Sequence, residues 1–593
     1  MSTPAQRLYE ELQPIHPPPT SFWKKYVFSI DHKVIGKQFL WAGLVFLLVG
    51  GVLAMMIRWQ WAFPYRKLPV LGDLLLPDSG GVISPATYQA VFTMHGLIMI
   101  FFAVTPVLIG AFGNFLIPLM IGARDMAFPK LNMYSFWTFL VSQGLVIAAF
   151  LTELGPAGAG WTTYPPLSTR IGTPGIGQSL VILALFVTGV SSTMGAVNYV
   201  TTVIRLRAPG MTYMRLPLTM WGLWLTAILN AIFIPVLGSA GILLLLDRHF
   251  GTQFFIAGAA APRGGDPILF QHLFWIFGHP EVYIMILPAW GILGDVIPTF
   301  ARKPHHWYRG TVASMVTVTV LSAVVYGHHM FVTGMSPLLG EGFMLFTLLI
   351  SAPSMIIVLN LVFTVWGGSP RLDTPMLFGL GTLVLFGISG LTGLLLGDIS
   401  MDLYLHDTMF VVGHFHFTMA AGSFVGAMTG LYFWFPKMFG KRLDERLGKI
   451  HFWFTFVGLL FVFGGQLLAG YAGQQRRLFD PFQYTFIQGL RSLNRWTSYF
   501  AFALFLGQLA FVVNFFRTVF GEAPAAGENA WGATTLEWAT ASPPPFHNFD
   551  EIPVVVRGPH ELSNPEVARL TGRDFAGQGE PLAGAPAPAG GEA

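Results

Sequence analysis

Long apolar stretches are the feature that most restricts how this 593-residue chain can fold. A helix needs about 20 apolar residues to cross a bilayer, and the chain offers about twelve such windows. They lie near residues 36–57, 88–118, 134–155, 178–204, 217–246, 269–299, 310–332, 343–366, 376–396, 403–434, 451–470 and 496–519. Only 10% of the residues are charged, against about 25% in soluble proteins. The sequence therefore predicts an all-α polytopic membrane bundle of about twelve transmembrane helices.

Basic residues predict the orientation of this bundle. Lysine and arginine are concentrated before the first span and after the second, fourth, sixth and tenth spans. By the positive-inside rule, both termini are cytoplasmic. We expect a cytoplasmic lead-in over residues 1–30, a membrane domain over 31–520 and a cytoplasmic tail over 521–593. The tail is rich in Ala, Gly and Pro, which predicts partial disorder and favours a bacterial inner membrane over a mitochondrial one.

The composition excludes several functions. The chain has no cysteine, so it cannot form disulfides, iron–sulfur clusters or a thiolate-bridged copper centre. Its net charge of +4 is small and the basic residues lie in short loops, which gives no case for nucleic-acid binding. Any metal must therefore be held mainly by histidine.

Six histidines of four spans fall in the predicted outer half of the membrane. Two of them lie two residues apart on one span, so they point about 200° apart on a helix. A single buried histidine is usually an ordinary core residue, but ionisable groups inside a membrane are costly and usually functional. A shared layer therefore favours a metal site made by His95, His279, His328, His329, His414 and His416.

Imidazole suits iron, copper and zinc. His95 and His416 could bind one haem from both sides, and His414 could bind a second haem and leave its other side open. The three histidines of spans six and seven could hold a copper ion facing that open side. Because adjacent residues such as His328 and His329 diverge by about 100° on a regular helix, this site requires a local distortion.

Two further side chains stand near the predicted copper site. Tyr283 follows His279 by four residues, which places it on the same helix face. Its phenol could supply an electron and a proton, or it could be an ordinary buried tyrosine that hydrogen-bonds a neighbour. Glu281 is a carboxyl deep in a span, as expected of a proton relay.

At these residues the chain resembles subunit I of the haem–copper oxygen reductases, in particular the A-type cytochrome c oxidases. The similar segments cover most of residues 30–480. They are SIDHKVIG, FTMHGLIMIFF, GNFLIPLMIGARDMAFPKLN, GWTTYPPLS, GVSSTMGAVNY, QHLFWIFGHPEVY, HHMFVTGM, LHDTMFVVGHFHF and QQRR.

The resemblance implies a set of cofactors. His95 and His416 would hold a low-spin haem A, and His414 a high-spin haem, also taken as haem A. The three histidines of spans six and seven would hold copper B. The resemblance also implies a covalent bond between Tyr283 and His279.

Further residues match positions around the haems. Arg476 and Arg477 fall where the family holds the haem propionates, and guanidinium groups suit carboxylates. His406 and Asp407 match positions near a propionate and a magnesium ion. Arg58 matches the residue that contacts the formyl group of haem A.

The family also implies a proton path from the cytoplasm. Its entrance would be Asp125, in the basic loop after the second span, and its end Glu281. Each residue between them has an ordinary structural explanation when taken alone, and only the whole set indicates a path. The set comprises Asn114, Asn132, Asn198, Ser191 and Ser192.

The chain departs from the family at a second proton path. Ile357 stands where many A-type members have a lysine on span eight, and Gly294 replaces a serine on span six, although Ser354 keeps a hydroxyl. Because isoleucine cannot relay protons, another route through Asp295 or Asn360 must operate, or the first path must serve throughout.

The quinol-oxidising relatives carry polar residues where this chain has Val49, Leu53, Thr87 and Ala90. This argues for cytochrome c as electron donor, through a dinuclear copper centre in subunit II, with subunit III and small subunits as further partners. The expected reaction is reduction of O₂ to water coupled to proton translocation. A nitric oxide reductase is the first alternative, which Tyr283 disfavours, and a transporter without cofactors is the second.

Overall fold

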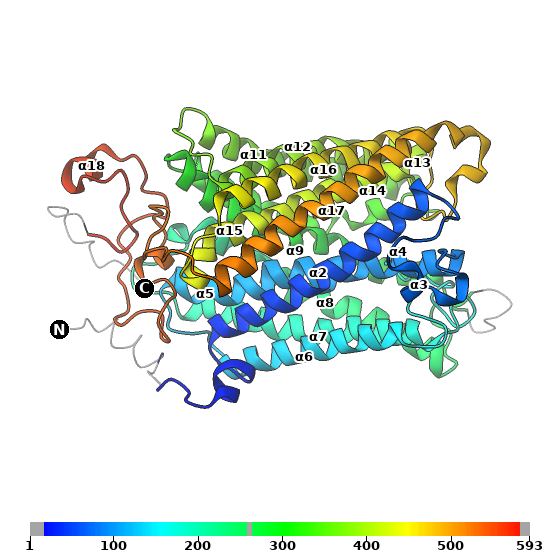
Figure 1. Ribbon diagram of the computed structural model, residues 1–593, viewed down its shortest axis with the longest axis horizontal. Coiled ribbons are helices and arrows are strands. Elements are labelled where there is room, and N and C mark those ends of the chain that lie inside the picture. The colour runs from blue at the N-terminus through cyan, green and yellow to red at the C-terminus, as the bar shows by residue number, and fades with distance from the viewer. Residues whose placement is uncertain (1–12, 14–16, 258–263, 582–593) are drawn as a thin grey trace.

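Long helices run side by side along the longest axis of the molecule (Figure 1). The computed structural model describes residues 13, 17–257 and 264–581. These residues contain three isolated β-bridges and no β-strand. They form eleven helical segments long and apolar enough to cross a membrane: α2 (His32–Ala62), α4 to α5 (Pro85–Ile121), α6 (Pro129–Phe150), α7 (Ile176–Arg205), α8 (Leu218–His249), α9 (Pro267–Ala301), α11 (Pro337–Val365), α12 (Thr374–Gly397), α14 to α15 (Met409–Phe439), α16 (Glu445–Tyr471) and η10 with α17 (Thr485–Phe520). The predicted all-α membrane bundle is confirmed.

The remaining predicted span, residues 310–332, is broken. Helix α10 covers only Tyr308–Ser322, and the 3₁₀ helix η7 (Val325–Met330) follows it. A 3₁₀ helix winds more tightly than an α-helix, with about three residues per turn. Gly327 allows the tight turn to approach α11, because a Cβ there would lie 2.3 Å from the ring of Phe343. The distortion expected at the adjacent His328 and His329 is therefore present.

Two spans contain π-helical segments beside candidate histidines. In the first, η3 (Ile98–Val104) and η4 (Pro106–Ala111) join α4 (Pro85–Leu97) to α5 (Phe112–Ile121), just after His95. In the second, η8 (Phe417–Phe424) joins α14 (Met409–His416) to α15 (Val425–Phe439), directly after His416. π-helical turns are rare and often occur at functional sites.

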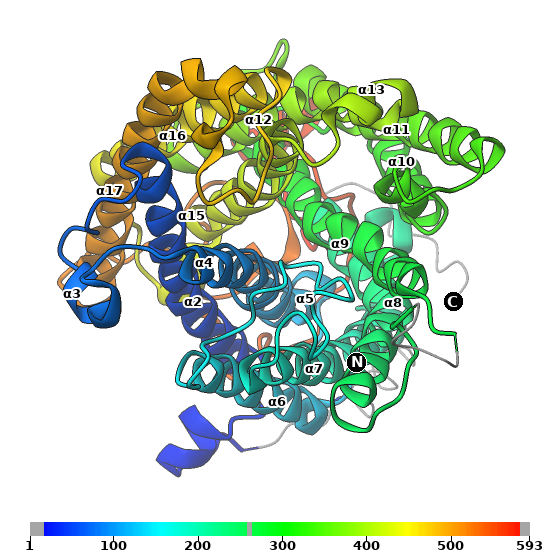
Figure 2. The ribbon, with the colours of Figure 1, turned by 90° about the vertical axis from the view of Figure 1, so that its right-hand side faces the viewer.

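Helix α9 and the α4–α5 segment form the interior of the bundle. The most apolar stretch of α9 is completely buried, and that of α4–α5 is largely buried. Seen along the helices, these segments lie inside a surround that includes α6, α7, α8, α10, α11, α12, α16 and α17 (Figure 2). The outer helices expose many large apolar side chains, as expected for contact with lipid.

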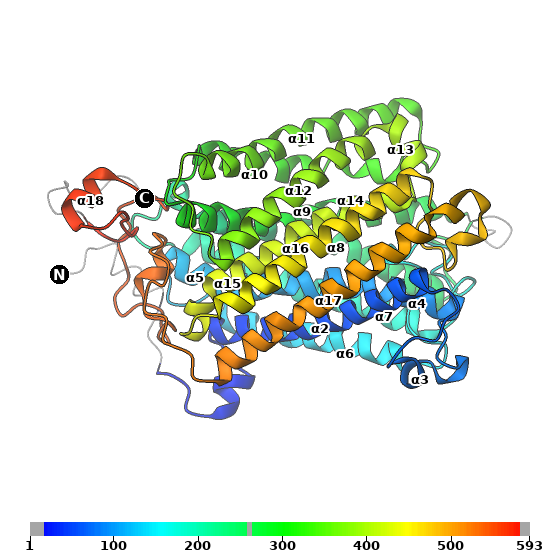
Figure 3. The ribbon, with the colours of Figure 1, turned by 45° about the horizontal axis from the view of Figure 1, so that its top comes forward.

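A C-terminal tail, residues 521–581, lies at one end of the bundle, opposite the short helices α3 (Gly72–Leu75) and α13 (Ile399–Leu405) (Figures 1 and 3). Trp531, Leu536, Trp538 and Val555 of the tail are buried. This length of tail is therefore packed, where composition had predicted partial disorder, while residues 582–593 and half of the lead-in (residues 1–12 and 14–16) lie outside the described residues. The remaining short helices are η1 (Trp23–Val27), η2 (Pro77–Ser79), η5 (Tyr213–Arg215), η9 (Pro481–Gln483), η10 (Thr485–Leu490), η11 (Leu536–Ala539) and α18 (Pro565–Thr571).

Candidate functional site

One cavity of about 1110 Å³ is lined by all six candidate histidines. We call it the histidine cavity. Pockets for a single small ligand are usually about 300–1000 Å³, so this space exceeds the needs of one such molecule. The other predicted cofactor residues line the same cavity: Arg58, Tyr283, His406, Asp407, Arg476 and Arg477. The structure therefore brings together residues that are more than 400 positions apart in the chain.

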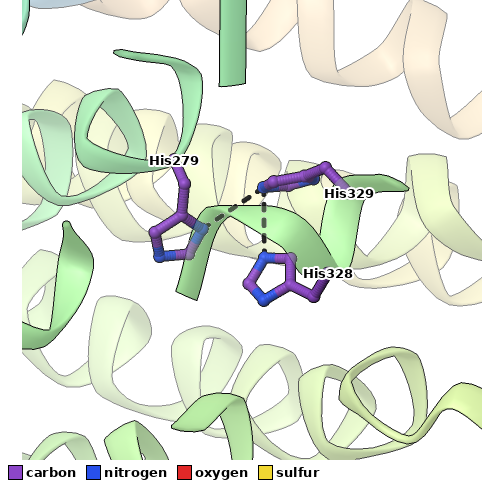
Figure 4. A group of neighbouring side chains, drawn as sticks. All are labelled: His279, His328 and His329. Carbon is purple, nitrogen blue, oxygen red and sulfur yellow. Dashed lines mark hydrogen bonds between the residues drawn. The ribbon is translucent and has the colours of Figure 1, made fainter. Parts of the chain in front are cut away.

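Three histidines at this cavity point their ring nitrogens toward one another (Figure 4). The Nε2 atom of His329 lies 3.2 Å from Nδ1 of His279 and 3.1 Å from Nε2 of His328. Among the described residues, this is the only group of three or more His, Cys, Asp or Glu side chains placed to hold one metal ion. Three imidazole nitrogens form a donor set suited to copper.

Two side chains hold these histidines in place, and sequence reasoning missed both. The ring of Trp275 stacks on His329, with 3.8 Å between ring centres. The Thr347 hydroxyl lies 2.8 Å from Nδ1 of His328 and donates its own proton to the Phe343 carbonyl. Nδ1 of His328 therefore donates to Thr347, which leaves the Nε2 lone pair free for a metal. Trp275 could have been noticed one turn before His279, whereas no local pattern marks Thr347.

His95 and His416 face each other from different spans. Their rings are almost parallel, with an angle of 9° and 6.4 Å between ring centres. Nδ1 of His95 donates to the Gly50 carbonyl (2.9 Å), and Nδ1 of His416 donates to the Val412 carbonyl (2.8 Å). Both Nε2 atoms remain available, and two metal–nitrogen bonds of about 2 Å each fit this separation. The pair can hold one metal ion between the rings.

His414 is directed to another part of the cavity, as the two-residue spacing from His416 predicts. Its Nδ1 lies 3.0 Å from the Thr392 hydroxyl of α12. Gly393 allows this close approach, because a Cβ there would lie 3.0 Å from Cε1 of His414. The remaining Nε2 is free to bind a second metal.

Tyr283 lies beside the three-histidine group. Its ring centre is 4.9 Å from that of His279, in agreement with the predicted shared helix face. The Nε2 atom of His279 is buried and has no hydrogen-bond partner among the described residues. A buried nitrogen without a hydrogen bond is costly. We therefore expect Nε2 of His279 to be bonded to something other than a hydrogen-bonding group of the chain.

Charged residues gather at the end of the cavity nearest α13. Arg476 donates from Nε to Oδ1 of Asp407 (2.5 Å), and its backbone N–H donates to the Asp407 carbonyl (2.9 Å). Burial alone would raise the pKa of Asp407, but the charge of Arg476, with His406 and Arg477, lowers it below its usual value. Burial and the neighbouring Arg476 lower the pKa of Arg477 to about 10, so it stays positive at neutral pH. His406 is paired with Asp402, at 3.2 Å.

A second, smaller cavity of about 60 Å³ contains three residues of the predicted proton path, Glu281, Ser191 and Ser192. The Thr105 hydroxyl donates weakly to Oε1 of Glu281, at 3.5 Å. This polar cavity is large enough for a few water molecules, and its other polar lining residues could bind them. Those residues are Thr105, Ser135, Thr188, Tyr199 and Asn230.

The three asparagines of the predicted path lie outside that cavity's lining. Both amide atoms of Asn132 are buried without a partner, as is Oδ1 of Asn114. The amide nitrogen of Asn114 donates to the Tyr199 hydroxyl (2.7 Å), which does line the polar cavity. Asn198 instead accepts from the backbone N–H of Phe128 (2.9 Å). Asn198 therefore has a structural task in holding the α5–α6 loop.

Asp125 lies in that loop, outside the spans. Its Oδ1 accepts a hydrogen bond from the Met126 N–H (2.7 Å). Burial, and then the negative charge of Asp31, raise the pKa of Asp125 to about 7. The carboxyl can therefore gain and lose a proton near neutral pH.

A membrane bundle with an opposed histidine pair, a separate three-histidine group and a further histidine in one cavity has the features of a haem–copper redox protein. Residues 34–507 match the family described as "Cytochrome C and Quinol oxidase polypeptide I". The chain therefore belongs to this family, which contains the catalytic subunits of the haem–copper terminal oxidases.

Individual relatives agree with this placement. The chain is 42% identical over 576 residues to the "Alternative cytochrome c oxidase subunit 1" of Bradyrhizobium diazoefficiens, covering 95% of this chain and 94% of that protein. It is 40% identical over 550 residues to the "Cytochrome c oxidase subunit 1" of Thermostichus vulcanus, covering 92% and 94%. A cryo-EM structure of a haem–copper terminal oxidase dimer matches 83% of this chain and 85% of its own, with a TM-score of 0.65 and 19% identity, and so shares the fold.

Proposed function

We propose that this terminal oxidase subunit uses electrons from cytochrome c to reduce O₂ to water and couples the reaction to proton translocation. The observation that carries the proposal is the histidine cavity, where six histidines present free nitrogens in three separate arrangements. No arrangement of this kind is needed by a transporter without cofactors. Family membership supports the oxidase class, and the names of the relatives support cytochrome c as donor.

The free nitrogens suggest where cofactors bind. His95 and His416 would hold a low-spin haem A, and His414 a high-spin haem A. The three-histidine group would hold copper B. When bound, these groups supply electron transfer and the binding and reduction of O₂. The chain fixes the ring orientations through backbone carbonyls and through the hydroxyls of Thr347 and Thr392.

Tyr283 would hold a proton next to the copper-binding group. The unpartnered Nε2 of His279 supports a covalent bond to Tyr283. Such a bond would satisfy the buried nitrogen and fix the phenol at the cavity wall. A mass spectrum of the α9 peptide should then show the loss of two hydrogen atoms.

Arg476 and Arg477 would pair with the haem propionates, and the buried Arg58 with the formyl group of haem A. A magnesium ion is the further expectation at His406 and Asp407. Nε2 of His406 lies 4.0 Å from Oδ2 of Asp407, and Asp407 already binds Arg476 through Oδ1. Because Mg²⁺ prefers six ligands and keeps several waters, these two residues would supply only part of the site.

Protons would enter at Asp125 and reach Glu281 through water in the polar cavity. The pKa of about 7 at Asp125 suits exchange with the solution. Glu281 and the two serines then offer a carboxyl and hydroxyls around space for water.

The positive-inside rule would place the tail-covered end in the cytoplasm of a bacterium, with the chain in the inner membrane. Two basic side chains contact the tail there: Arg302 donates to Asp574 and Lys441 to the Gly521 carbonyl. Because the chain contains no cysteine, a dinuclear copper centre would belong to a subunit II, with subunit III and small subunits as further partners. At the position where the quinol-oxidising relatives carry polar residues, Thr87 has a structural role instead. Its hydroxyl lies 2.9 Å from that of Ser84, the N-cap residue of α4.

Metal content and substrate use of the purified complex test this function. We expect haem iron and copper together, with O₂ uptake driven by reduced cytochrome c. Non-haem iron with nitric oxide consumption would indicate a nitric oxide reductase. O₂ uptake driven only by quinol would contradict the proposed donor, and an absorption spectrum without haem bands would contradict the oxidase itself.

The proton path is tested by Asp125→Asn in membrane vesicles, with Asp550→Asn, an exposed acid of the tail, as the control. If O₂ uptake persists while proton ejection disappears, Asp125 feeds a pump and another route supplies chemical protons. Loss of both activities fits a single shared entrance. A variant that matches wild type in both activities would show that the path through Asp125 is wrong.

A further inference from the structure

The loop between α9 and α10 contains a buried histidine that the proposed mechanism does not use. His305 is 6% exposed, and neither ring nitrogen makes a well-aligned hydrogen bond to a described residue, although the His306 backbone lies nearby. A neutral imidazole has one N–H donor and one nitrogen acceptor. The ring of His305 therefore has a buried donor and a buried acceptor that both need partners, and water can hydrogen-bond with each.

A second buried histidine comes from the tail. Nε2 of His560 lies 2.8 Å from Oδ1 of Asp295 on α9, and both side chains are almost fully buried. The His560 ring is 5.9 Å from the His305 ring and 6.2 Å from that of Tyr308. Asp295 also accepts the backbone N–H groups of Leu218 (3.0 Å) and of the residue after it, so it caps α8 as well.

Helix α11 continues this polar cluster toward the histidine cavity. The His306 backbone N–H donates to the Thr364 hydroxyl (3.0 Å), and Asn360 donates from Nδ2 to the Thr311 hydroxyl (2.9 Å). Residues three or four apart share a helix face, so Thr364 and Asn360 lie on the face that leads to Ser354.

One apolar side chain lies on this face between Asn360 and Ser354. It is the buried Ile357, in the position where many A-type members have a lysine. The histidine cavity, however, reaches Ser354 and Val358, and it contains Tyr283. Ser354, which lines the cavity, lies six residues before Asn360, about 9 Å along the helix axis. Val358 points about 160° away from Asn360, so a route from the polar cluster to the cavity must pass beside Ile357.

We propose that His305, with the His560–Asp295 pair, forms the entrance of a second hydrated proton route that leads past Asn360 and Ser354 to Tyr283. This inference rests on the proposed oxidase function. The C-terminal tail then contributes a proton-carrying residue to the membrane domain. Only protons move along this route, since electrons reach the cavity through the cofactors.

The charges around the entrance are few. Burial, and then the nearby His560, lower the pKa of His305 to about 3, so its ring is neutral at physiological pH. The titratable groups that face the two histidines are Asp295 of α9, Tyr308 of α10, His306 of the loop and, at greater distance, Glu537 of the tail. A neutral imidazole can accept a proton on one nitrogen and release the other proton, which suits a relay between two water molecules.

The test measures how fast the high-spin haem is reduced in the purified complex without O₂. An electron that enters a buried site needs a compensating proton, so this rate reports proton delivery to the histidine cavity. We compare wild type with His305→Ala, His560→Gln and the control His249→Ala, an exposed histidine at the end of α8 away from this cluster. Each rate is then measured again with imidazole and with pyrrole, which has the same shape but accepts no proton.

We expect His305→Ala and His560→Gln to slow reduction of the high-spin haem by at least about 10-fold, while the low-spin haem and the control are unaffected. Imidazole should restore the rate of His305→Ala and pyrrole should not. Unchanged rates in either variant, or equal restoration by pyrrole, would overturn the proposal. Trypsin cleavage at Arg557 should remain as slow as in wild type, which shows that the tail stays docked. A wild-type complex without haem or O₂ uptake would instead contradict the proposed function.

Discussion

Around the histidine cavity, histidine side chains use one ring nitrogen for a hydrogen bond within the protein and leave the other nitrogen free. His95 and His416 follow this pattern, each with Nδ1 on a backbone carbonyl. At the tail-covered end, the buried ammonium group of Lys437 is instead saturated by the chain. Lys437 donates to the carbonyls of Glu528 (3.0 Å) and Thr540 (2.6 Å), and also to that of Ala541.

The contrast follows from the different roles of the two regions, since the cavity has room for ligands and the tail covers the ends of the helices. Free buried nitrogens are costly unless a ligand binds them, so the first pattern indicates space for cofactors. Saturated charges stabilise a closed surface over the helix ends. The exceptions at the second end include both ring nitrogens of His305 and Oε2 of Glu537, which have no hydrogen-bond partner among the described residues.

The largest effect is expected from His279→Ala, which removes one of the three nitrogens of the metal-binding group. Copper content and O₂ uptake should fall by more than about 100-fold, because changes even behind a ligand cost 10–100-fold in metal affinity. Metal analysis and oxygen electrode measurements test this, with His306→Ala as the matched control. Normal copper content in His279→Ala would mean that the three-histidine group does not bind copper.

Lys437→Met should release part of the tail. The change leaves one buried carbonyl and two partly buried carbonyls without their donor, which we expect to cost about 3 kcal/mol of tail docking. Faster proteolysis of residues 521–581, measured with the complex in detergent, would show the loss. Unchanged proteolysis would show that the hydrogen bonds of Lys437 do not hold the tail in place, and would contradict the contrast between the tail-covered end and the histidine cavity.

Glu537 gives the tail-covered end a pH dependence. Burial raises the pKa of Glu537 from 4.5 to about 7, although Trp434 and Thr535 donate to its Oε1. Between pH 5 and 7 the folded state therefore holds a proton that the unfolded state has lost, so this group makes stability fall as pH rises. Glu537→Gln keeps the acceptor and removes the titration. Its stability relative to wild type should be about 2 kcal/mol more favourable at pH 8 than at pH 5. Thermal unfolding at both pH values measures this, and a constant difference would contradict it.

The smallest effect is expected from Thr347→Val, which keeps the size of the side chain but removes the acceptor for Nδ1 of His328. Copper affinity should fall by about 10-fold. Competition with a copper chelator measures the affinity, and Thr392→Val serves as a control because it acts on His414. A fall of copper affinity in both variants would show that the two sites are not independent.

Much of the site could be predicted because its residues lie in local patterns. The two-residue spacing of His414 and His416 fixes their opposite directions on any helix, and the four-residue spacing of His279 and Tyr283 fixes their shared face. The contacts of Thr347 with His328 could not be predicted, because no spacing rule connects a hydroxyl on α11 to a ring on η7. The same holds for Gly50 and His95, which are 45 residues apart.

The sequence by itself determined the membrane bundle, the histidine layer and the absence of thiol chemistry, because hydropathy and residue type act locally along each helix. Only the tertiary structure decided that η7 is a 3₁₀ helix that brings His328 and His329 to His279. It also decided that the tail folds back so that His560 contacts Asp295, 265 residues away. Such contacts depend on the packing of whole helices against one another. Their energy comes from burial and long-range hydrogen bonds, which leave no period in the sequence.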